Sequence, residues 1–248
     1  MLDAENSRPF HGSVPAGRVA CALCSAMSPK AALIFLHGSG DTGEGVQEWL
    51  SCVSRGAFEA ELGRGGVALQ CPTAPMVPYS LNGGRPQRVW FDRVAMAYDA
   101  PEDEAGLKRS VELVDKEIDK LKALGLPSSK IGVAGMSMGG CLALHVGYGM
   151  GRHAGTLGLV ASLSTFLPKD SCLDALVARS LSAPLFMAHG RDDCMIQLPW
   201  AEATYKRLQS AGIAAKELLI FPGVQHELCA EEVKQLQDFV LQNLSGAK

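Results

Sequence analysis

Two kinds of hydrophobic pattern alternate along this chain. Short, almost continuous apolar runs are typical of strands that are buried on both faces of a parallel sheet. The predicted strands are residues 31–36, 67–71, 131–134, 157–163, 184–188 and 216–221. Between these runs, apolar residues recur every three or four positions, which predicts helices that bury one face. The predicted helices are residues 45–54, 101–124, 141–148, 171–179, 199–211 and 230–244.

Strands that alternate with helices at this spacing predict the α/β fold class, with a mainly parallel sheet, helices on both faces and a single domain. Residues 1–18 are polar and contain Pro and Gly, so we expect a flexible N-terminal tail before a domain over 19–248. Residues 19–27 are a further possible strand. Residues 73–100 lack clear periodicity but hold large apolar side chains, which indicates a functional loop rather than disorder.

The segment 101–124 has the clearest helical pattern. Its apolar positions step by three and four and form one stripe. Pro101 suits the first helical turn, and the acidic residues at 102–104 suit the positive end of the helix dipole. Gly125 is predicted to end the helix.

The strand 131–134 runs directly into Gly135-Met136-Ser137-Met138-Gly139, and a predicted helix follows. A serine in the pattern G-x-S-x-G between a strand and a helix is the signature of a nucleophile elbow. The tight turn lifts the hydroxyl above the end of the sheet, and flanking glycines have no Cβ to clash with nearby backbone. Glycine is common in this chain (27 of 248 residues), so the motif alone could be a chance match. It predicts a nucleophilic Ser137 only if other strand ends supply its partners.

Two later strand ends supply an acid and a base. One strand leads into residues 189–193, which include Asp192 and Asp193, and the next leads into a loop that contains His226. The carboxyl ends of parallel strands meet at one edge of a sheet, so both loops should lie beside Ser137. A serine hydroxyl needs an adjacent imidazole to accept its proton, and a carboxylate orients that imidazole. We predict His226 as the base and Asp193 or Asp192 as the acid, in the order that is typical of α/β-hydrolases.

Backbone N–H groups that could stabilise an oxyanion are predicted at two places. Met138 follows the predicted nucleophile at the start of a helix, and Ser39 lies in the glycine-rich loop 37–43 after the strand 31–36. The glycines allow this loop to turn its amides toward a substrate. The loop lacks the Lys-Ser/Thr ending of a P-loop and the spacing of a dinucleotide-binding fingerprint, so an oxyanion hole is favoured over a phosphate site.

Composition and charge narrow the function classes. A hydrophobic content of 47% with 20% charged residues is typical of a globular protein with a sizeable core. A net charge of −3 and a pI near 6.1 give no reason to expect nucleic acid as a partner. The sequence has no signal-peptide pattern and no apolar run long enough for an integral membrane segment, so we expect a cytoplasmic protein with at most transient membrane contact.

The eight cysteines are spread too thinly for a disulfide scaffold. Cys21 and Cys24 form a CxxC pair, but no second pair follows at zinc-ribbon spacing, so reduced cysteines are favoured over a metal or redox site. His145 falls inside the predicted helix 141–148 and is expected to be a packing or surface residue.

An ordered set of motifs resembles the acyl-protein thioesterase and lysophospholipase family of α/β-hydrolases. The matching segments are residues 35–43, 72–75, 89–92, 135–140, 189–190 with Asp193, and 226–227, and they span nearly the whole chain. In that family the acid lies three residues after the glycine of the His-Gly pair, which implies Asp193 here. Ser39 and the segment 90–93 are most similar to the lysophospholipase-like protein 1 branch. Cys194-Met195 departs from the Pro-Leu that thioesterases usually have there.

The resemblance implies a serine hydrolase that cleaves acyl esters or thioesters through an acyl-enzyme, with a closed pocket that favours short to medium acyl chains. We expect an acylated protein or a small acyl ester as substrate, no metal and no cofactor, and a monomer or weak homodimer. The residues predicted to contact the acyl group are Met76, Trp90, Phe91, Phe166 and Leu167. The alternatives are a general carboxylesterase, a peptidase of the same fold, or a hydrolase-fold binding protein with a vestigial triad.

Overall fold

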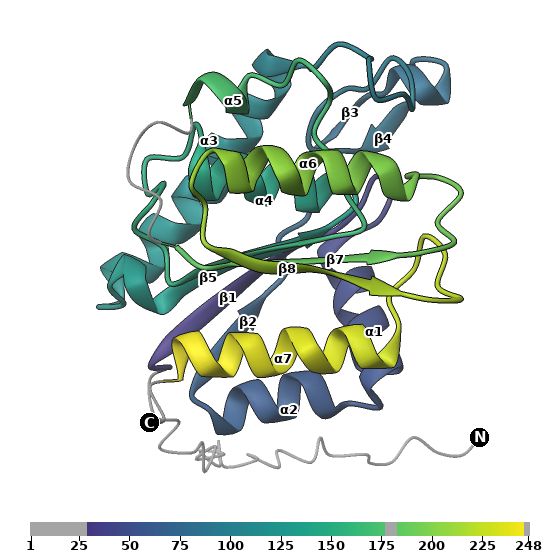
Figure 1. Ribbon diagram of the computed structural model, residues 1–248. Coiled ribbons are helices and arrows are strands. Elements are labelled where there is room, and N and C mark those ends of the chain that lie inside the picture. Colours follow the sequence, from purple (N-terminus) through teal and green to yellow (C-terminus); the bar gives the residue numbers. More distant parts are fainter. Residues whose placement is uncertain (1–28, 177–182, 246–248) are drawn as a thin grey trace, which may run out of the picture.

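Within residues 29–176 and 183–245, the part of the chain that the computed structural model describes, six strands form one parallel sheet (Figure 1). The strands are β1 (Ala31–Leu36), β2 (Val67–Gln70), β5 (Ile131–Met136), β6 (Leu159–Leu163), β7 (Leu185–Gly190) and β8 (Ala215–Phe221). Their order across the sheet is β2-β1-β5-β6-β7-β8. All six residues of β1 and of β5 are buried, as the continuous apolar runs predict. The predicted parallel α/β sheet is confirmed.

Helices cover both faces of this sheet (Figure 1). One face is covered by α3 (Glu104–Ala123), α4 (Met138–Tyr148), α5 (Leu173–Leu176) and α6 (Leu198–Ser210). The other face is covered by α1 (Gly43–Ser54), α2 (Ala57–Arg64) and α7 (Ala230–Leu244). The sheet therefore separates two hydrophobic cores, and α4 is buried along its whole length against β5 and β6.

Some sequence predictions lie outside the described residues. They are the tail over 1–18, the possible strand 19–27, the pair Cys21 and Cys24, and the end of the predicted helix 171–179. Among the described helices, none is long and apolar enough to cross a membrane.

The start of α3 differs from the prediction. The helix begins at Glu104, and the side chain of Asp103 caps it by accepting the N–H of Gly106 at 2.9 Å. Asp103 is the N-cap because its side-chain oxygen accepts a helical N–H group that would otherwise have no partner. Pro101, which was predicted to lie in the first helical turn, therefore lies before the helix. The side chain of Glu102 points into the protein rather than serving the helix dipole, and it meets His145 of α4. The short helix α2 was not predicted.

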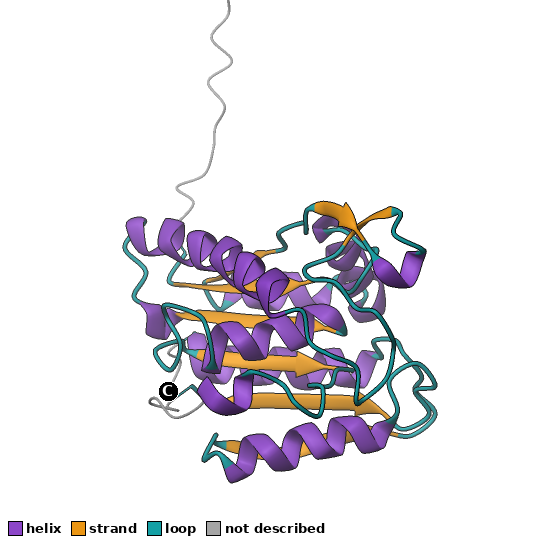
Figure 2. Ribbon diagram, turned by 90° about the horizontal axis from the view of Figure 1, so that it is seen from above, coloured by secondary structure: helices purple, strands orange, loops and turns teal. Residues whose placement is uncertain are grey.

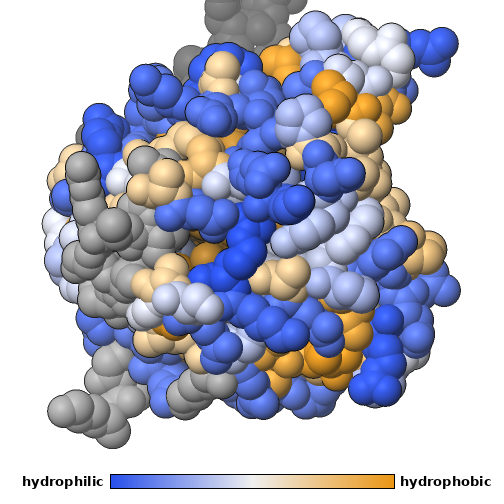
Figure 3. Space-filling model, turned by 45° about the horizontal axis from the view of Figure 1, so that its top comes forward, coloured by the Kyte–Doolittle hydropathy of each residue, from blue (hydrophilic) through white to orange (hydrophobic). Residues whose placement is uncertain are grey.

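The segment 73–100 contains regular structure that its sequence did not indicate. A small antiparallel sheet pairs β3 (Met76–Pro78) with β4 (Pro86–Arg88), and a 3-10 turn joins them (Ser80–Asn82). Figure 2 shows this small sheet apart from the main one. Met76 is 55% exposed and Leu81 is 40% exposed, and Figure 3 shows hydrophobic surface over this region at the upper right. Pro78 of β3 pairs with Pro86 of β4. These prolines obscure the strand pattern in the sequence, because proline usually argues against a strand.

Glu232 offers a test of the packing of α7. Its side chain is almost fully buried in the first turn of that helix, and neither carboxylate oxygen has a partner among the described residues. Burial raises the pKa of Glu232 from 4.5 to about 8, with partial opposition from the backbone N–H of Cys229. The folded state therefore binds more protons than the unfolded state between these two values, so the carboxyl costs stability as the pH rises through that window.

We expect Glu232→Gln to remove this pH dependence. The difference in unfolding free energy between variant and wild type should grow in favour of the variant from about pH 4.5 to pH 8, reach a few kcal/mol in order of magnitude, and then level off. Chemical denaturation at a series of pH values measures it. The matched control is Glu231→Gln, at the exposed neighbouring position, which should show no such trend. A constant difference for Glu232→Gln across this range would contradict the assignment.

Candidate active site

Ser137 occupies a strained turn between β5 and α4. Its backbone has φ 55° and ψ −121°, a left-handed conformation that L-residues rarely adopt. Two neighbours hold the backbone in place, since the Ser137 N–H donates to the carbonyl of Leu163 at 2.9 Å and Thr165 Oγ1 donates to the carbonyl of Ser137 at 2.7 Å. Strain of this kind persists only where surrounding contacts over-determine it, and it is common at functional sites.

The glycines of the motif are required by close backbone approach. A Cβ on Gly135 would lie 2.3 Å from the carbonyl oxygen of Gly139. A Cβ on Gly139 would lie 2.1 Å from the carbonyl oxygen of Leu36 and 2.6 Å from that of His37. The start of α4 therefore packs directly on the end of β1, which brings Ser137 beside the loop 37–43.

Three side chains from separate loops form a chain of hydrogen bonds. His226 Nε2 lies 3.0 Å from Ser137 Oγ, and His226 Nδ1 lies 2.7 Å from Asp193 Oδ2. Ser137 and Asp193 are both buried, and the side chain of His226 between them is 15% exposed. This arrangement can move the serine proton onto the imidazole while the carboxylate stabilises the resulting positive charge.

Asp193, and not Asp192, meets the histidine. Asp193 Oδ1 accepts the backbone N–H groups of Met195 and Ile196 at 2.9 and 2.8 Å, which leaves Oδ2 for His226. Burial alone would raise the pKa of Asp193, but the hydrogen bonds from His226 and Ile196 outweigh it and lower that pKa, so the carboxylate stays ionised. Asp192 is exposed and instead accepts the N–H of Gly223 at 2.7 Å, which holds the turn after β8.

His189 lies behind the carboxylate of Asp193 and was not assigned a role beside it from the sequence. Its fully buried Nε2 donates to the carbonyl of Ile196 at 2.8 Å and lies 3.6 Å from Asp193 Oδ2. Burial lowers the pKa of His189, so the ring is neutral at physiological pH and adds no charge next to Asp193. Its position at the end of β7, one residue before a glycine, was the signal available in the sequence.

The loop 37–43 is fixed by the segment that precedes α3. His37 is fully buried, and its Nε2 accepts the N–H of Ala74 at 2.9 Å. Trp90 Nε1 donates to the carbonyl of His37 at 2.9 Å, and the two rings pack with centroids 5.1 Å apart. The N–H of Gly40 donates to the carbonyl of Arg88 at 2.8 Å. The region 73–100 thus determines where the loop 37–43 places its amides.

The two predicted oxyanion donors lie on either side of Ser137. Met138 begins α4, and Ser39 lies on the loop 37–43 next to Gly38, whose missing Cβ would be 3.4 Å from Ser137 Cβ. Within the described part of the chain, the N–H groups of Ser39 and Met138 donate to no other residue. Both donors are therefore free to bind a ligand atom, and that of Met138 lies at the positive end of a helix.

Two cavities border Ser137. The larger has a volume of about 240 Å³ and includes Val46 and Trp49 of α1 and Met195 in its lining, whereas the smaller is about 10 Å³ and includes Tyr79 and Arg93. Ser39 lines both. Val46 and Trp49 carried no sequence signal beyond their place on a helix face.

The five residues predicted to contact the acyl group lie elsewhere. Met76 is exposed on the small sheet, and the other four are buried and do not line either cavity. Those four are Trp90, Phe91, Phe166 and Leu167. Trp90 holds the loop 37–43 as described, and Phe166 packs against Trp200 and the guanidinium of Arg93. The apolar character of the four buried residues reflects packing. From the sequence alone, an apolar loop residue that packs in the core cannot be told apart from one that contacts a ligand.

Comparisons with known proteins show the family of the chain. The family described as Phospholipase/Carboxylesterase matches residues 19–244. The chain belongs to this family. As a member of the Phospholipase/Carboxylesterase family it has the α/β-hydrolase fold and is a hydrolase of the ester and thioester class.

Individual relatives cover most of the chain. Mouse lysophospholipase-like protein 1 is 32% identical over 91% of this chain and 92% of its own length. Acyl-protein thioesterase 1 homolog 2 of Dictyostelium discoideum is 31% identical over 85% of this chain and 91% of its own. The crystal structure of Arabidopsis thaliana SOBER1 superposes with a TM-score of 0.75 at 27% identity, covering 86% of this chain and 99% of that one. The predicted family is confirmed.

The packing of Gly139 on β1 predicts the effect of adding a single methyl group. Because the Cβ would overlap backbone that cannot move aside, Gly139→Ala should lower the unfolding free energy by about 3 kcal/mol, the upper end of typical overpacking costs. Thermal or urea unfolding measures this. The matched control is Gly63→Ala in α2, where nothing lies within 4 Å of the added Cβ and alanine should stabilise the helix by up to about 1 kcal/mol. Equal effects of the two substitutions would contradict the close approach.

Proposed function

We propose that the chain is a serine hydrolase that cleaves acyl esters or thioesters through Ser137, His226 and Asp193. The observation that carries this proposal is the unbroken set of hydrogen bonds from Asp193 through His226 to Ser137, at 2.7 and 3.0 Å. A strained serine between a strand and a helix, with free N–H groups beside it, supports the same assignment.

The first half of the proposed reaction forms an acyl-enzyme. His226 Nε2 takes the proton of Ser137 Oγ as the oxygen attacks the acyl carbonyl carbon, and the carbonyl π electrons move onto its oxygen. When the tetrahedral intermediate collapses, the bond to the leaving group breaks. The proton on His226 then passes to the leaving alcohol or thiol, so the histidine returns to its neutral form.

In the second half, water releases the acid. His226 takes a proton from a water molecule that attacks the acyl carbon, and the returning electrons break the bond to Ser137 Oγ. The serine recovers its proton from the imidazole. Asp193 remains ionised throughout, which its hydrogen bonds and lowered pKa support.

The backbone N–H groups of Ser39 and Met138 are the proposed oxyanion donors. They are already oriented by the loop 37–43 and by the start of α4, so little reorganisation is needed when charge develops on the substrate oxygen. Removal of one such donor typically costs roughly 10²–10³ in kcat. The hydrogen bond from Trp90 to the carbonyl of His37 supports this role indirectly, because it fixes the loop.

The proposed substrates carry short to medium acyl chains. The cavity beside Ser137, of about 240 Å³, is smaller than the roughly 300–1,000 Å³ of typical ligand pockets, and Val46, Trp49 and Met195 give it an apolar lining. A small apolar cavity supports a short to medium acyl chain rather than palmitoyl. The names of the relatives support an acylated protein or a lysophospholipid-like ester as substrate. A general carboxylesterase acting on small esters would use the same cavity.

Two experiments test the triad: chemical labelling of Ser137 and substitution of the adjacent Asp192 and Asp193. A fluorophosphonate probe should label the wild type once, and Ser137→Ala should abolish labelling because the nucleophile is gone. Asp193→Asn should reduce kcat by about 10⁴-fold, the typical cost when the orienting carboxylate of a triad is lost. Asp192→Asn is the matched control and should keep most of the activity, since Asp192 holds only the turn at Gly223. Labelling that persists in Ser137→Ala, or equal losses at the two aspartates, would contradict the assignment.

Chain-length preference is tested with p-nitrophenyl esters and acyl thioesters of increasing length. We expect kcat/KM to rise or hold up to the medium range and then fall, because longer chains exceed the cavity. A panel with ester, thioester and amide bonds separates a thioesterase from a carboxylesterase or a peptidase. A maximum at palmitoyl would contradict the proposed preference.

A further inference from the structure

Three potential metal ligands from distant parts of the sequence meet on the α3 side of the sheet. Glu102 precedes α3, His145 lies in α4, and Cys172 precedes α5. One ligand atom from each lies within 4.8 Å of the others. His145 Nε2 is 3.2 Å from Glu102 Oε1, and the two side chains are 0% and 3% exposed. A buried carboxylate, a buried imidazole and a partly buried thiol have thus been brought together away from Ser137.

The carboxylate of Glu102 is already oriented by its neighbours. Ser171 Oγ lies 3.0 Å from each of its oxygens, and the backbone N–H of Cys172 donates to Oε2 at 2.9 Å. Metal-binding carboxylates are commonly held by such outer partners. His145 Nδ1, in contrast, is buried and has no hydrogen-bond partner among the described residues, so the ring is only half satisfied by its protein surroundings.

We propose that Glu102, His145 and Cys172 form a binding site for a zinc ion. A nitrogen, an oxygen and a sulfur ligand together match the borderline-soft character of Zn²⁺, and three protein ligands with an open fourth position are a common zinc arrangement. Zinc–nitrogen and zinc–oxygen bonds of about 2.1 Å place two ligands of a tetrahedral ion roughly 3.4 Å apart. The 3.2 Å between His145 Nε2 and Glu102 Oε1 is close to that spacing.

The charges of the site balance when the ion is bound. Coordination replaces the hydrogen bond between His145 and Glu102. The proton on His145 Nε2 and the thiol proton of Cys172 are both released to solvent, and the imidazole is left neutral with its remaining proton on Nδ1. A divalent cation then faces one carboxylate, one thiolate and one neutral imidazole, for a net charge of zero. Burying a neutral set costs far less than burying an uncompensated ion, so the protein interior can accept the metal.

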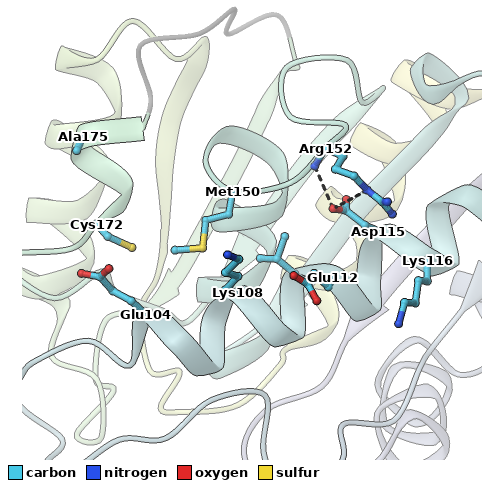
Figure 4. A pocket seen from close by; sticks show the side chains of 10 residues that line it. Glu104, Lys108, Glu112, Asp115, Lys116, Met150, Arg152, Cys172 and Ala175 are labelled. Carbon is cyan, nitrogen blue, oxygen red and sulfur yellow. Dashed lines mark hydrogen bonds and ion pairs between the residues drawn. The ribbon is translucent and has the colours of Figure 1, made fainter.

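Cys172 connects the cluster to a large cavity through which an ion could enter. This cavity, of about 840 Å³, is lined by residues of α3, Met150, Arg152 and Cys172 (Figure 4). In Figure 4 the sulfur of Cys172 points into the cavity toward Met150, with Glu104 beside it at the same end. Water from the cavity can supply the fourth ligand.

The site is independent of the proposed hydrolysis. His145 lies eight positions beyond Ser137 on α4, roughly 12 Å along the helix axis. The bound ion would join the segment before α3, the helix that starts at the nucleophile, and the segment before α5. The simpler alternative is a buried ion pair between Glu102 and His145 with Cys172 as a bystander. In the proposed site the thiol of Cys172 binds the metal, whereas in the alternative it binds none.

Cobalt substitution distinguishes them, because a Co²⁺–thiolate bond gives a near-ultraviolet charge-transfer band that carboxylate and imidazole ligands do not. The full chain with Cys21→Ser and Cys24→Ser serves as background, which removes the CxxC pair as a competing ligand. The protein is stripped with chelator under reducing conditions and titrated with Co²⁺, and Zn²⁺ affinity is then measured by competition with a chromophoric chelator. Circular dichroism confirms that each variant is folded.

We expect one Co²⁺ per chain with a thiolate band, and displacement of that band by Zn²⁺. Cys172→Ser should abolish the band and weaken Zn²⁺ binding by more than the roughly 10–100-fold that loss of an outer partner typically costs. Ser171→Ala should keep the band and weaken binding within that smaller range. Cys52→Ser, at an exposed cysteine of α1, is the matched control and should change nothing.

Two results would overturn the proposal. One is the absence of a thiolate band in the background protein. The other is a band or an affinity that Cys172→Ser leaves unchanged, which would assign the metal to an adventitious site. Since the readout is metal binding and not hydrolysis, either outcome leaves the proposed function standing, and failure of the proposed function leaves this site untouched.

Discussion

The contact between Gly139 and the end of β1 is the constraint on which the rest of the site depends. The carbonyl oxygens of Leu36 and His37 occupy the space that a side chain at Gly139 would need. This contact fixes the distance between the first turn of α4 and the loop 37–43, and therefore between Ser137 and the amide of Ser39. A sheet with β1 and β5 adjacent and parallel allows it, because both strands end at the same edge.

The strained serine and the irregular loop are both held by parts of the chain that perform no chemistry. Thr165 and Leu163 bind the backbone of Ser137 on either side, while Trp90 binds the carbonyl of His37. The contacts that these residues make offset the backbone strain at Ser137. The segment 73–100 is therefore best understood as the support of the loop 37–43, although its apolar side chains suggested contact with a substrate.

The sequence predicted those features that depend on local pattern. Buried parallel strands read as continuous apolar runs, and the glycines around Ser137 report a backbone constraint that no other residue satisfies. Features that depend on tertiary contacts were harder to predict from the sequence. The residues alone left Asp192 and Asp193 open, because only their partners, Gly223 and His226, differ. The role of Trp90 could not be predicted before its hydrogen-bond partner, the carbonyl of His37, was known. The grouping of Glu102 with His145 had no local signal either, since helix packing brings them together.

In the proposed reaction Ser137 carries the acyl group during turnover. The most direct measurement is mass spectrometry of the protein quenched in acid during reaction with p-nitrophenyl acetate, followed by peptide mapping. We expect one acetyl group, on the peptide that contains Ser137, and we expect His226→Ala to form it far more slowly than the wild type, because the serine then has no base to take its proton. Turnover with no acetylated peptide, or an acetyl group on another residue at the catalytic rate, would contradict it.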